Sequence, residues 1–190
     1  AVLCGIDEGG ALAIDFAIAH PGRTVGLVLV GTSITGSEAP DLPEEAEGLV
    51  GGRDYAESRG SLEQVNRLDA HLWLDGPLEE QGRVEGEGRD LFLDMNLLAL
   101  RMGHPGEDEE RDPAVDLVTT ITAPVLLLVG ELDFPHIVER HDDLGEELEN
   151  AFAVVIEEAA HLPQLERPDL VNPLMIEFLE AITQAGEGED

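Results

Sequence analysis

The sequence contains no lysine, a single cysteine and few aromatic residues. Its 10 basic residues are therefore all arginines, and they stand against 42 aspartates and glutamates, which gives a formal net charge of −32. A surface of this charge repels phosphate backbones and anionic lipid headgroups, so we expect neither nucleic acid nor a membrane as a partner. With Cys4 alone, an internal disulfide and a multi-cysteine metal site are both excluded, which is usual in a reducing compartment.

Long apolar runs are also missing. No stretch approaches the roughly 20 residues that a membrane-spanning helix needs, and the chain does not open with the pattern of a signal peptide, so we expect a cytoplasmic protein. The hydrophobic fraction of 43% is nevertheless sufficient for a folded core. At 190 residues, against a prior of about 150 residues per domain, the length predicts one domain with an inserted subdomain.

The acidic, lysine-free composition is similar to that of proteins from organisms with a salt-rich cytosol, and we interpret it as halophilic. Negative charges repel one another in dilute buffer, whereas in molar salt the Debye length falls to about 3 Å and this repulsion fades. We expect the melting temperature to rise with KCl concentration and to continue rising above ~0.5 M. A curve that flattens below this concentration would instead indicate acidic drift in a genome that favours arginine.

Strands and helices alternate along the chain, which predicts an α/β fold with a parallel sheet of about four strands. The core is expected at 1–32 and 114–183, with strands at residues 1–4, 25–30, 123–130 and 151–156. Its helices are expected at 11–20, 137–148 and 168–181, and Pro173 predicts a kink in the last one or a start delayed to Asn172. Residues 33–113 are acidic, rich in glycine and interrupted by proline, which indicates an inserted helical cap. The acidic tail, 184–190, is expected to be disordered.

The first functional motif lies at the amino terminus. An apolar strand is followed by Gly5-Ile6-Asp7-Glu8-Gly9 and then by a helix, which is the pattern of a nucleophile elbow. The glycines permit a sharp turn that raises the central side chain, here Asp7, above the edge of the sheet. The following helix N-terminus offers backbone N–H groups to an oxyanion.

Two further residues complete a catalytic pattern. Asp133 comes just after a buried strand, and His161 lies in the loop after the next strand. Glu131 is the other candidate for the acid. Asp133 is favoured because it lies two residues further beyond the end of the strand than Glu131 does. Because the carboxyl ends of parallel strands meet at one edge, we expect Asp7, Asp133 and His161 to converge.

These stretches resemble the C-terminal two thirds of an α/β-hydrolase fold protein. The resemblance to the family rests on three stretches, "CGIDEGGALAIDFAIAHPGRTVGLVLVGT", "APVLLLVGELDFPHI" and "AAHLPQLERPDLVNPLMIEFL". Two cap segments, "HLWLDGP" and "MNLLAL", are similar to those of esterase- or lactonase-like members related to 3-oxoadipate enol-lactonases. It implies a hydrolase of a small-molecule ester or lactone, without metal or cofactor. Asp7, Asp133 and His161 would hold the triad positions, and the Glu8 N–H would be an oxyanion donor. Trp73 would belong either to the core of the cap or to the substrate pocket.

The sequence departs from this family in two ways. Esterases of the family have serine where this chain has Asp7, and the family begins with further strands and a loop that supplies a second oxyanion donor. The strand at residues 1–4 would then lie in mid-sheet with an open edge. We therefore expect a partial domain, or pairing with another chain along this strand.

Asp7 has three interpretations. It is a nucleophile, as in haloalkane dehalogenases and epoxide hydrolases. Alternatively, it is an inactivating substitution in a serine hydrolase, where it would hold His161 as imidazolium. In the third interpretation, a slow hydrolysis remains in which His161 or Asp7 acts as a general base toward water. A non-catalytic protein that binds a small molecule between sheet and cap is the alternative from another class.

Overall fold

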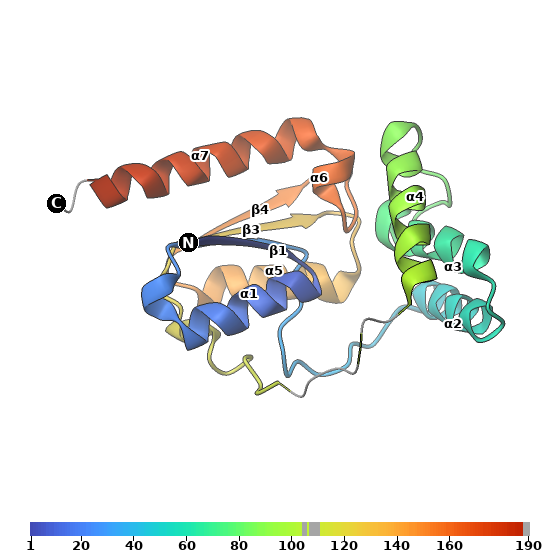
Figure 1. The fold of residues 1–190 in the computed structure, drawn as a ribbon, viewed down its shortest axis with the longest axis horizontal. Coiled ribbons are helices and arrows are strands. Elements are labelled where there is room, and N and C mark those ends of the chain that lie inside the picture. Colours follow the sequence, from blue (N-terminus) through green and yellow to red (C-terminus); the bar gives the residue numbers. More distant parts are fainter. Residues whose placement is uncertain (104–105, 107–110, 188–190) are drawn as a thin grey trace.

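A computed structural model describes residues 1–103, 106 and 111–187. Its centre is a parallel sheet in the order β1 (Val2–Ile6), β2 (Gly26–Val30), β3 (Val125–Gly130) and β4 (Ala151–Ile156). Figure 1 shows helices on both sides of this sheet. The predicted α/β class with a parallel sheet of four strands is therefore confirmed.

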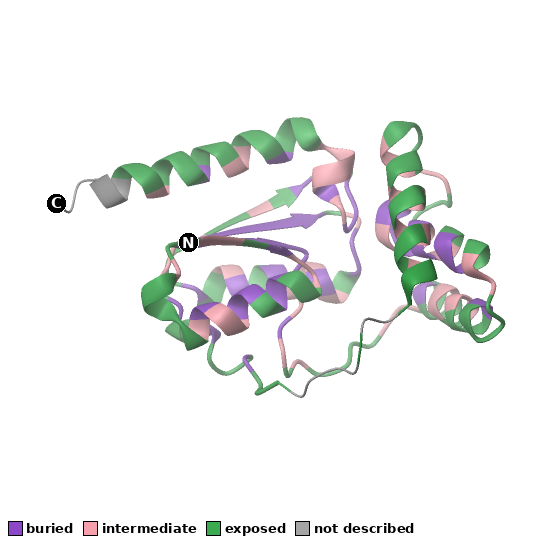
Figure 2. Cartoon of the chain, viewed as in Figure 1, coloured by how far each residue is buried: buried purple, intermediate pink, exposed green. Residues whose placement is uncertain are grey.

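The two faces of the sheet are covered by different helices. Helices α1 (Glu8–Ala19) and α5 (Pro135–Glu147) pack on the face that presents Leu27 and Leu29, while α7 (Pro168–Glu187) packs on the opposite face. The short helices η1 (Pro21–Arg23), η3 (Val118–Thr120) and α6 (Pro163–Glu166) join these elements. Every residue of β2 and β3 is buried, which is why both strands are continuous apolar runs (Figure 2).

Two helices differ from the expectation. Helix α7 begins at Pro168 and continues past Pro173, so the delayed start at Asn172 is wrong. The same helix continues to Glu187, so residues 184–187, which we expected to be disordered, are helical. Gln184 and Ala185 both favour a helix. The rest of the expected disordered tail, 188–190, lies outside the described residues. In α1, Ile14 and the small residues Ala13 and Ala17 are buried against the sheet, whereas Leu12 is 57% exposed.

The segment between β2 and β3 forms α2 (Glu44–Ser58), α3 (Leu62–Asp69), the π-helical turn η2 (Ala70–Asp75) and α4 (Glu87–Met102). These helices lie beyond the carboxyl ends of the strands (Figure 1). Ala46 and Leu72 of this cap pack against Val129, Phe134 and Ile137 of the core. The cap therefore closes over the edge where the predicted site residues emerge.

Strand β1 lies at an edge of the sheet. Among the described residues its only strand partner is β2, and Val2, Leu3 and Ile6 are half-buried while Cys4 is exposed. Pairing of another chain along this edge stays a prediction. None of the helices in the described ranges combines the length and the apolar character needed to cross a bilayer.

Candidate active site

The turn between β1 and α1 is a strained elbow. Asp7 has φ 47° and ψ −116°, in the left-handed region that non-glycine residues seldom occupy. Two glycines make this turn possible, because a Cβ at Gly5 would lie 2.2 Å from the Gly9 carbonyl oxygen and one at Gly10 would lie 2.1 Å from Thr32 Oγ1. Strand and helix thus approach closely and present the half-buried Asp7 side chain above the sheet.

Glu8 is the first residue of α1, directly after the elbow. The first N–H groups of a helix have no acceptor within the helix, so the Glu8 N–H is free of such a bond. Its side chain is exposed. The Glu8 N–H is therefore available to an acceptor at the start of the helix; its use by an oxyanion stays a prediction.

Asp133 and His161 form a buried hydrogen-bonded pair. His161 Nδ1 lies 2.8 Å from Asp133 Oδ2, and the two side chains are 5% and 0% exposed. The Phe134 N–H donates to Asp133 Oδ1 at 2.7 Å and fixes the carboxylate. Gly31, at φ 48°, leaves room for the pair, because a Cβ there would lie 3.0 Å from His161 Nδ1. A neutral His161 that donates from Nδ1 keeps Nε2 as its proton acceptor.

The environment favours the charged form of His161. Burial alone would lower the pKa of the imidazole, but the hydrogen bond and charge of Asp133, together with the charge of Asp7, outweigh it and raise this pKa above its ordinary value. Among the described residues no hydrogen bond joins Asp7 to His161, so Asp7 acts on the imidazole by its charge. The structure therefore brings Asp133 and His161 into contact and places Asp7 within electrostatic range.

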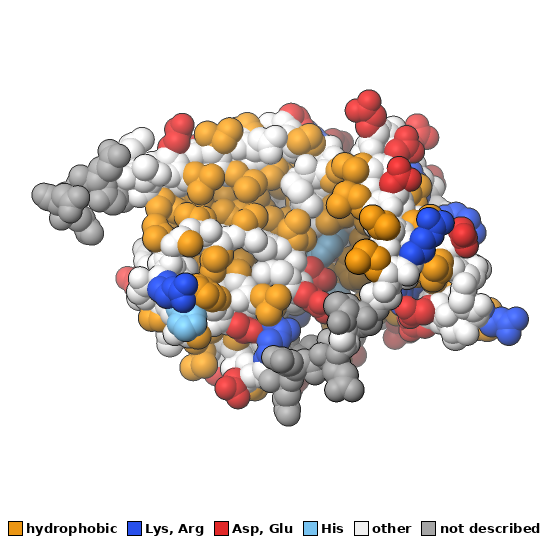
Figure 3. All heavy atoms as spheres, viewed as in Figure 1, with side chains coloured by type: hydrophobic (Ala, Val, Ile, Leu, Met, Phe, Trp, Pro, Cys, Tyr) orange, Lys and Arg blue, Asp and Glu red, His pale blue; other side chains and the backbone are white. Residues whose placement is uncertain are grey.

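Trp73 of η2 covers the imidazole. Its ring centroid lies 4.9 Å from that of His161 and 5.0 Å from that of Phe134. Trp73 also packs against the apolar cluster between cap and core, so both roles considered for it fit its position. In Figure 3, a histidine and acidic side chains gather where the cap meets the core.

Two residues of α5 near the elbow were not singled out from the sequence. The charge of Asp7 acts on both His136 and Arg140, and burial lowers the pKa of each. His136 Nδ1 is buried without a hydrogen-bond partner. Their i, i+4 spacing just after Asp133 places both on one face of the helix, and this spacing is the signal that sequence reasoning could have used.

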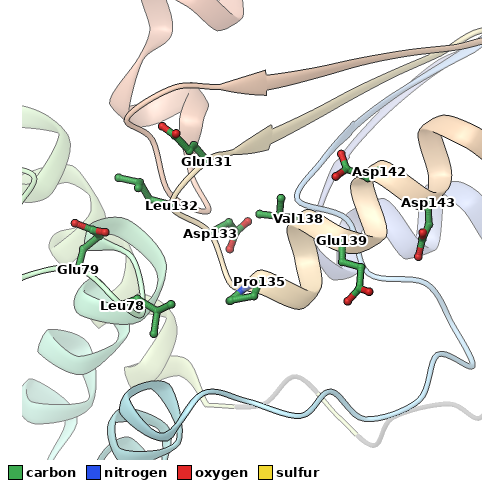
Figure 4. A pocket seen from close by; sticks show the side chains of 10 residues that line it. All are labelled: Leu78, Glu79, Glu131, Leu132, Asp133, Pro135, Val138, Glu139, Asp142 and Asp143. Carbon is green, nitrogen blue, oxygen red and sulfur yellow. The ribbon is translucent and has the colours of Figure 1, made fainter.

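Asp133 also lines a hollow of about 620 Å³ between the start of α5 and the cap segment of Leu78 and Glu79 (Figure 4). Six of the ten residues that line it are acids: Glu79, Glu131, Asp133, Glu139, Asp142 and Asp143. Neither Asp7 nor His161 lines this hollow. Within the described ranges, no three His, Cys, Asp or Glu side chains are arranged to hold a metal ion.

The chain has recognisable relatives. It is 30% identical, over 196 residues, to a pimeloyl-[acyl-carrier protein] methyl ester esterase of Pectobacterium atrosepticum, with 95% of this chain and 71% of the esterase covered. A thermophilic esterase from Thermogutta terrifontis superimposes with a TM-score of 0.65 at 27% identity, covering 95% of this chain and 65% of that one. A carboxylesterase from Bacillus subtilis shares the fold, with a TM-score of 0.60 at 24% identity and coverage of 94% and 59%. No family model matches. The chain thus spans 59–71% of the length of these proteins.

Proposed function

The chain belongs to the α/β-hydrolase family, and we propose that it cleaves carboxylic esters with Asp133 and His161 as its acid–base pair and with Asp7 at the position of the nucleophile. The buried contact of 2.8 Å between Asp133 and His161, beside the elbow, is the observation on which this proposal rests. The ester as substrate class is supported by the relative at 30% identity, which is a methyl ester esterase.

The proposed reaction uses His161 as a general base toward water. His161 Nε2 takes a proton from a water molecule while the water oxygen bonds to the ester carbonyl carbon. The carbonyl oxygen becomes an oxyanion and accepts a hydrogen bond from the Glu8 N–H. The carbon–oxygen bond to the alcohol then breaks, and the leaving alkoxide takes the proton from the imidazolium. Asp133 holds the imidazole in place and stabilises its charged form.

Asp7 limits the rate of this reaction. An acyl group transferred to a carboxylate would form an anhydride, so Asp7 does not provide the acyl-enzyme route of a serine esterase. Its negative charge also raises the pKa of His161, which reduces the fraction of free base at neutral pH. We therefore propose slow ester hydrolysis that depends on His161.

The release of p-nitrophenol from p-nitrophenyl butyrate tests this proposal. Because the base must be deprotonated, we expect kcat/KM to rise with pH through the raised pKa of His161, at an inflection above the usual value of about 6.5. His161→Gln should remove this hydrolysis. His141→Gln is the matched control, since His141 is 5% exposed and His161 4%. Equal rates for wild type and His161→Gln would refute the proposal.

Asp7 itself supports a second candidate, an aspartate-nucleophile hydrolase. Its carboxylate is presented by the strained elbow, and its charge reaches His161. An Asp7 oxygen would bond to a saturated carbon as halide departs, and water activated by His161 would then attack the Asp7 carboxyl carbon, releasing the alcohol and restoring the carboxylate. Halide release from 1-bromobutane measures this reaction, and 18O from labelled water would enter Asp7. The negative Glu8 next to the site opposes a departing anion.

A further inference from the structure

Arg83 lies in the cap between η2 and α4 and is anchored to the end of η2. Its Nε donates to the Asp75 carbonyl oxygen at 2.6 Å, and its Nη2 donates to the Leu74 carbonyl oxygen at 3.0 Å. The Asp75 carboxylate in turn accepts hydrogen bonds from the Gly82 and Val84 N–H groups on either side of Arg83 in the sequence. The guanidinium is thus fixed relative to the turn that contains Trp73.

The same guanidinium reaches across to the core. Nη2 lies 2.5 Å from Glu166 Oε2, and Nη1 donates to the Glu158 carbonyl oxygen at 2.9 Å. Glu166 Oε1 accepts the N–H of Ala160, the residue before His161, at 2.8 Å. A chain of direct contacts therefore runs from the cap through Arg83 and Glu166 to the backbone that holds the imidazole.

The loop needs this support, because it includes a strained residue. Glu158 has φ 58°, one of two positive values among the described non-glycine residues, the other being Asp7. Its N–H is bonded to Glu131 Oε2 and its carbonyl to Arg83, so both sides of the strained residue are held. A conformation of this kind persists only where its surroundings impose it.

Charge adds to this geometry. Burial raises the pKa of Glu166, and this effect is opposed by Arg83 and by the Ala160 N–H. Without Arg83, the buried carboxyl would lose its counter-charge and would take up a proton more readily. A neutral carboxyl is a weaker acceptor for Ala160, so its hold on the loop would weaken.

We propose that Arg83 is a positioning residue that, through Glu166 and the Glu158 carbonyl, fixes His161 beneath Trp73, so that docking of the cap and placement of the imidazole occur together. The contact between the rings of Trp73 and His161, 4.9 Å between centroids, is the product of this coupling. The inference goes beyond the proposed function by assigning to the cap a role in the geometry of the base.

Trp73 is the chain's one tryptophan, so its fluorescence reports on this contact directly. An imidazolium quenches an adjacent indole more strongly than neutral imidazole does. We expect the fluorescence of the wild type to rise with pH in a step at the pKa of His161, and His161→Gln should lose this step. The His161→Gln curve also shows any contribution from other histidines.

Arg83→Met should lose the His161-dependent step while retaining a cooperative unfolding transition. Arg53→Met is the matched control, because Arg53 also lies in the cap, is 27% exposed against 22% for Arg83, and pairs with the buried Asp69 rather than with the His161 loop. It should keep the full step. Glu166→Gln should weaken the step, because a neutral amide is a weaker acceptor for the Ala160 N–H than the carboxylate.

A full-sized step at an unchanged midpoint in Arg83→Met would overturn the proposal, as would loss of the step in Arg53→Met. Should Arg83→Met fail to fold, Arg83→Lys decides: lysine keeps the charge but cannot serve four acceptors, so a reduced step is expected and an unchanged step refutes the coupling. Where ester hydrolysis is measurable, Arg83→Met should lower kcat by about 10- to 100-fold with little change in KM. Only this kinetic measurement rests on the proposed function, so absence of activity in the wild type would leave the fluorescence test decisive.

Discussion

Replacing Asp7 by serine should raise the rate of ester hydrolysis by on the order of 10³-fold. Loss of the serine costs on the order of 10⁶-fold in a serine protease, and we expect a smaller gain because the described residues offer one proposed oxyanion donor, the Glu8 N–H, where two are usual. The serine hydroxyl would be placed by the same elbow, next to the pair formed by Asp133 and His161. An acyl-enzyme that water can cleave then becomes possible.

The substitution also changes the base. Removing the charge of Asp7 removes one of the effects that raise the pKa of His161, so the inflection of kcat/KM against pH should move to lower pH. Asp7→Asn separates the two consequences, because it removes the charge and supplies no hydroxyl. It should reproduce the shift in pH without the large gain in rate. If Asp7→Ser is no faster than Asp7→Asn toward p-nitrophenyl butyrate, the elbow does not present a nucleophile to esters.

The same pair of variants distinguishes the two candidate functions. An aspartate nucleophile requires the carboxylate, so halide release should disappear in both Asp7→Ser and Asp7→Asn. A gain in ester hydrolysis without any halide release in the wild type would support the esterase proposal alone. Ligand binding without turnover in wild type and Asp7→Ser would instead favour the non-catalytic alternative.

The features of the core that could be predicted are those encoded by local sequence. A strand buried on both faces must be apolar at every position, so strands at 25–30 and 123–130 were recognisable. Gly26–Val30 in β2 and Val125–Gly130 in β3 are buried throughout, whereas Val25, just before β2, is 50% exposed. The contact between Asp133 and His161 could be anticipated because the carboxyl ends of parallel strands meet at one edge. In both cases the local sequence identifies a strand, and the strand determines where its residues and the loop after it lie in the fold.

Other features depend on neighbours that are distant in sequence. Arg83 and Glu166 are separated by 83 positions, and no periodicity connects them. The apolar pattern of residues 62–75 does not show where α3 changes to the π-helical turn η2. Cys4 is exposed because β1 lies at an edge of the sheet, as the open edge expected along this strand implies.

The cap should depend strongly on Asp75, and Asp75→Ala should lower the free energy of unfolding by about 3–5 kcal/mol. The carboxylate is fully buried and accepts hydrogen bonds from Arg89 Nη1 at 2.7 Å and from the backbone N–H groups of Gly82 and Val84. Its removal would leave the Arg89 charge without its buried partner and two N–H groups without an acceptor. Urea unfolding followed by the fluorescence of Trp73, two residues away, measures the loss.

Asp54→Ala is the control for this prediction. Asp54 lies 3.6 Å from Arg53 in the same cap, but its side chain is 66% exposed, so its removal should change the unfolding free energy by no more than about 0.5 kcal/mol. A loss below about 1 kcal/mol in Asp75→Ala would mean that Arg89 finds water or another acceptor, as expected of an exposed pair. Trp73 fluorescence that completes its transition at a lower urea concentration than far-UV circular dichroism, which reports the helices of cap and core together, would show that the cap unfolds before the sheet. Because Arg83 bonds to the Asp75 carbonyl, that result would also connect the stability of the cap to the placement of His161.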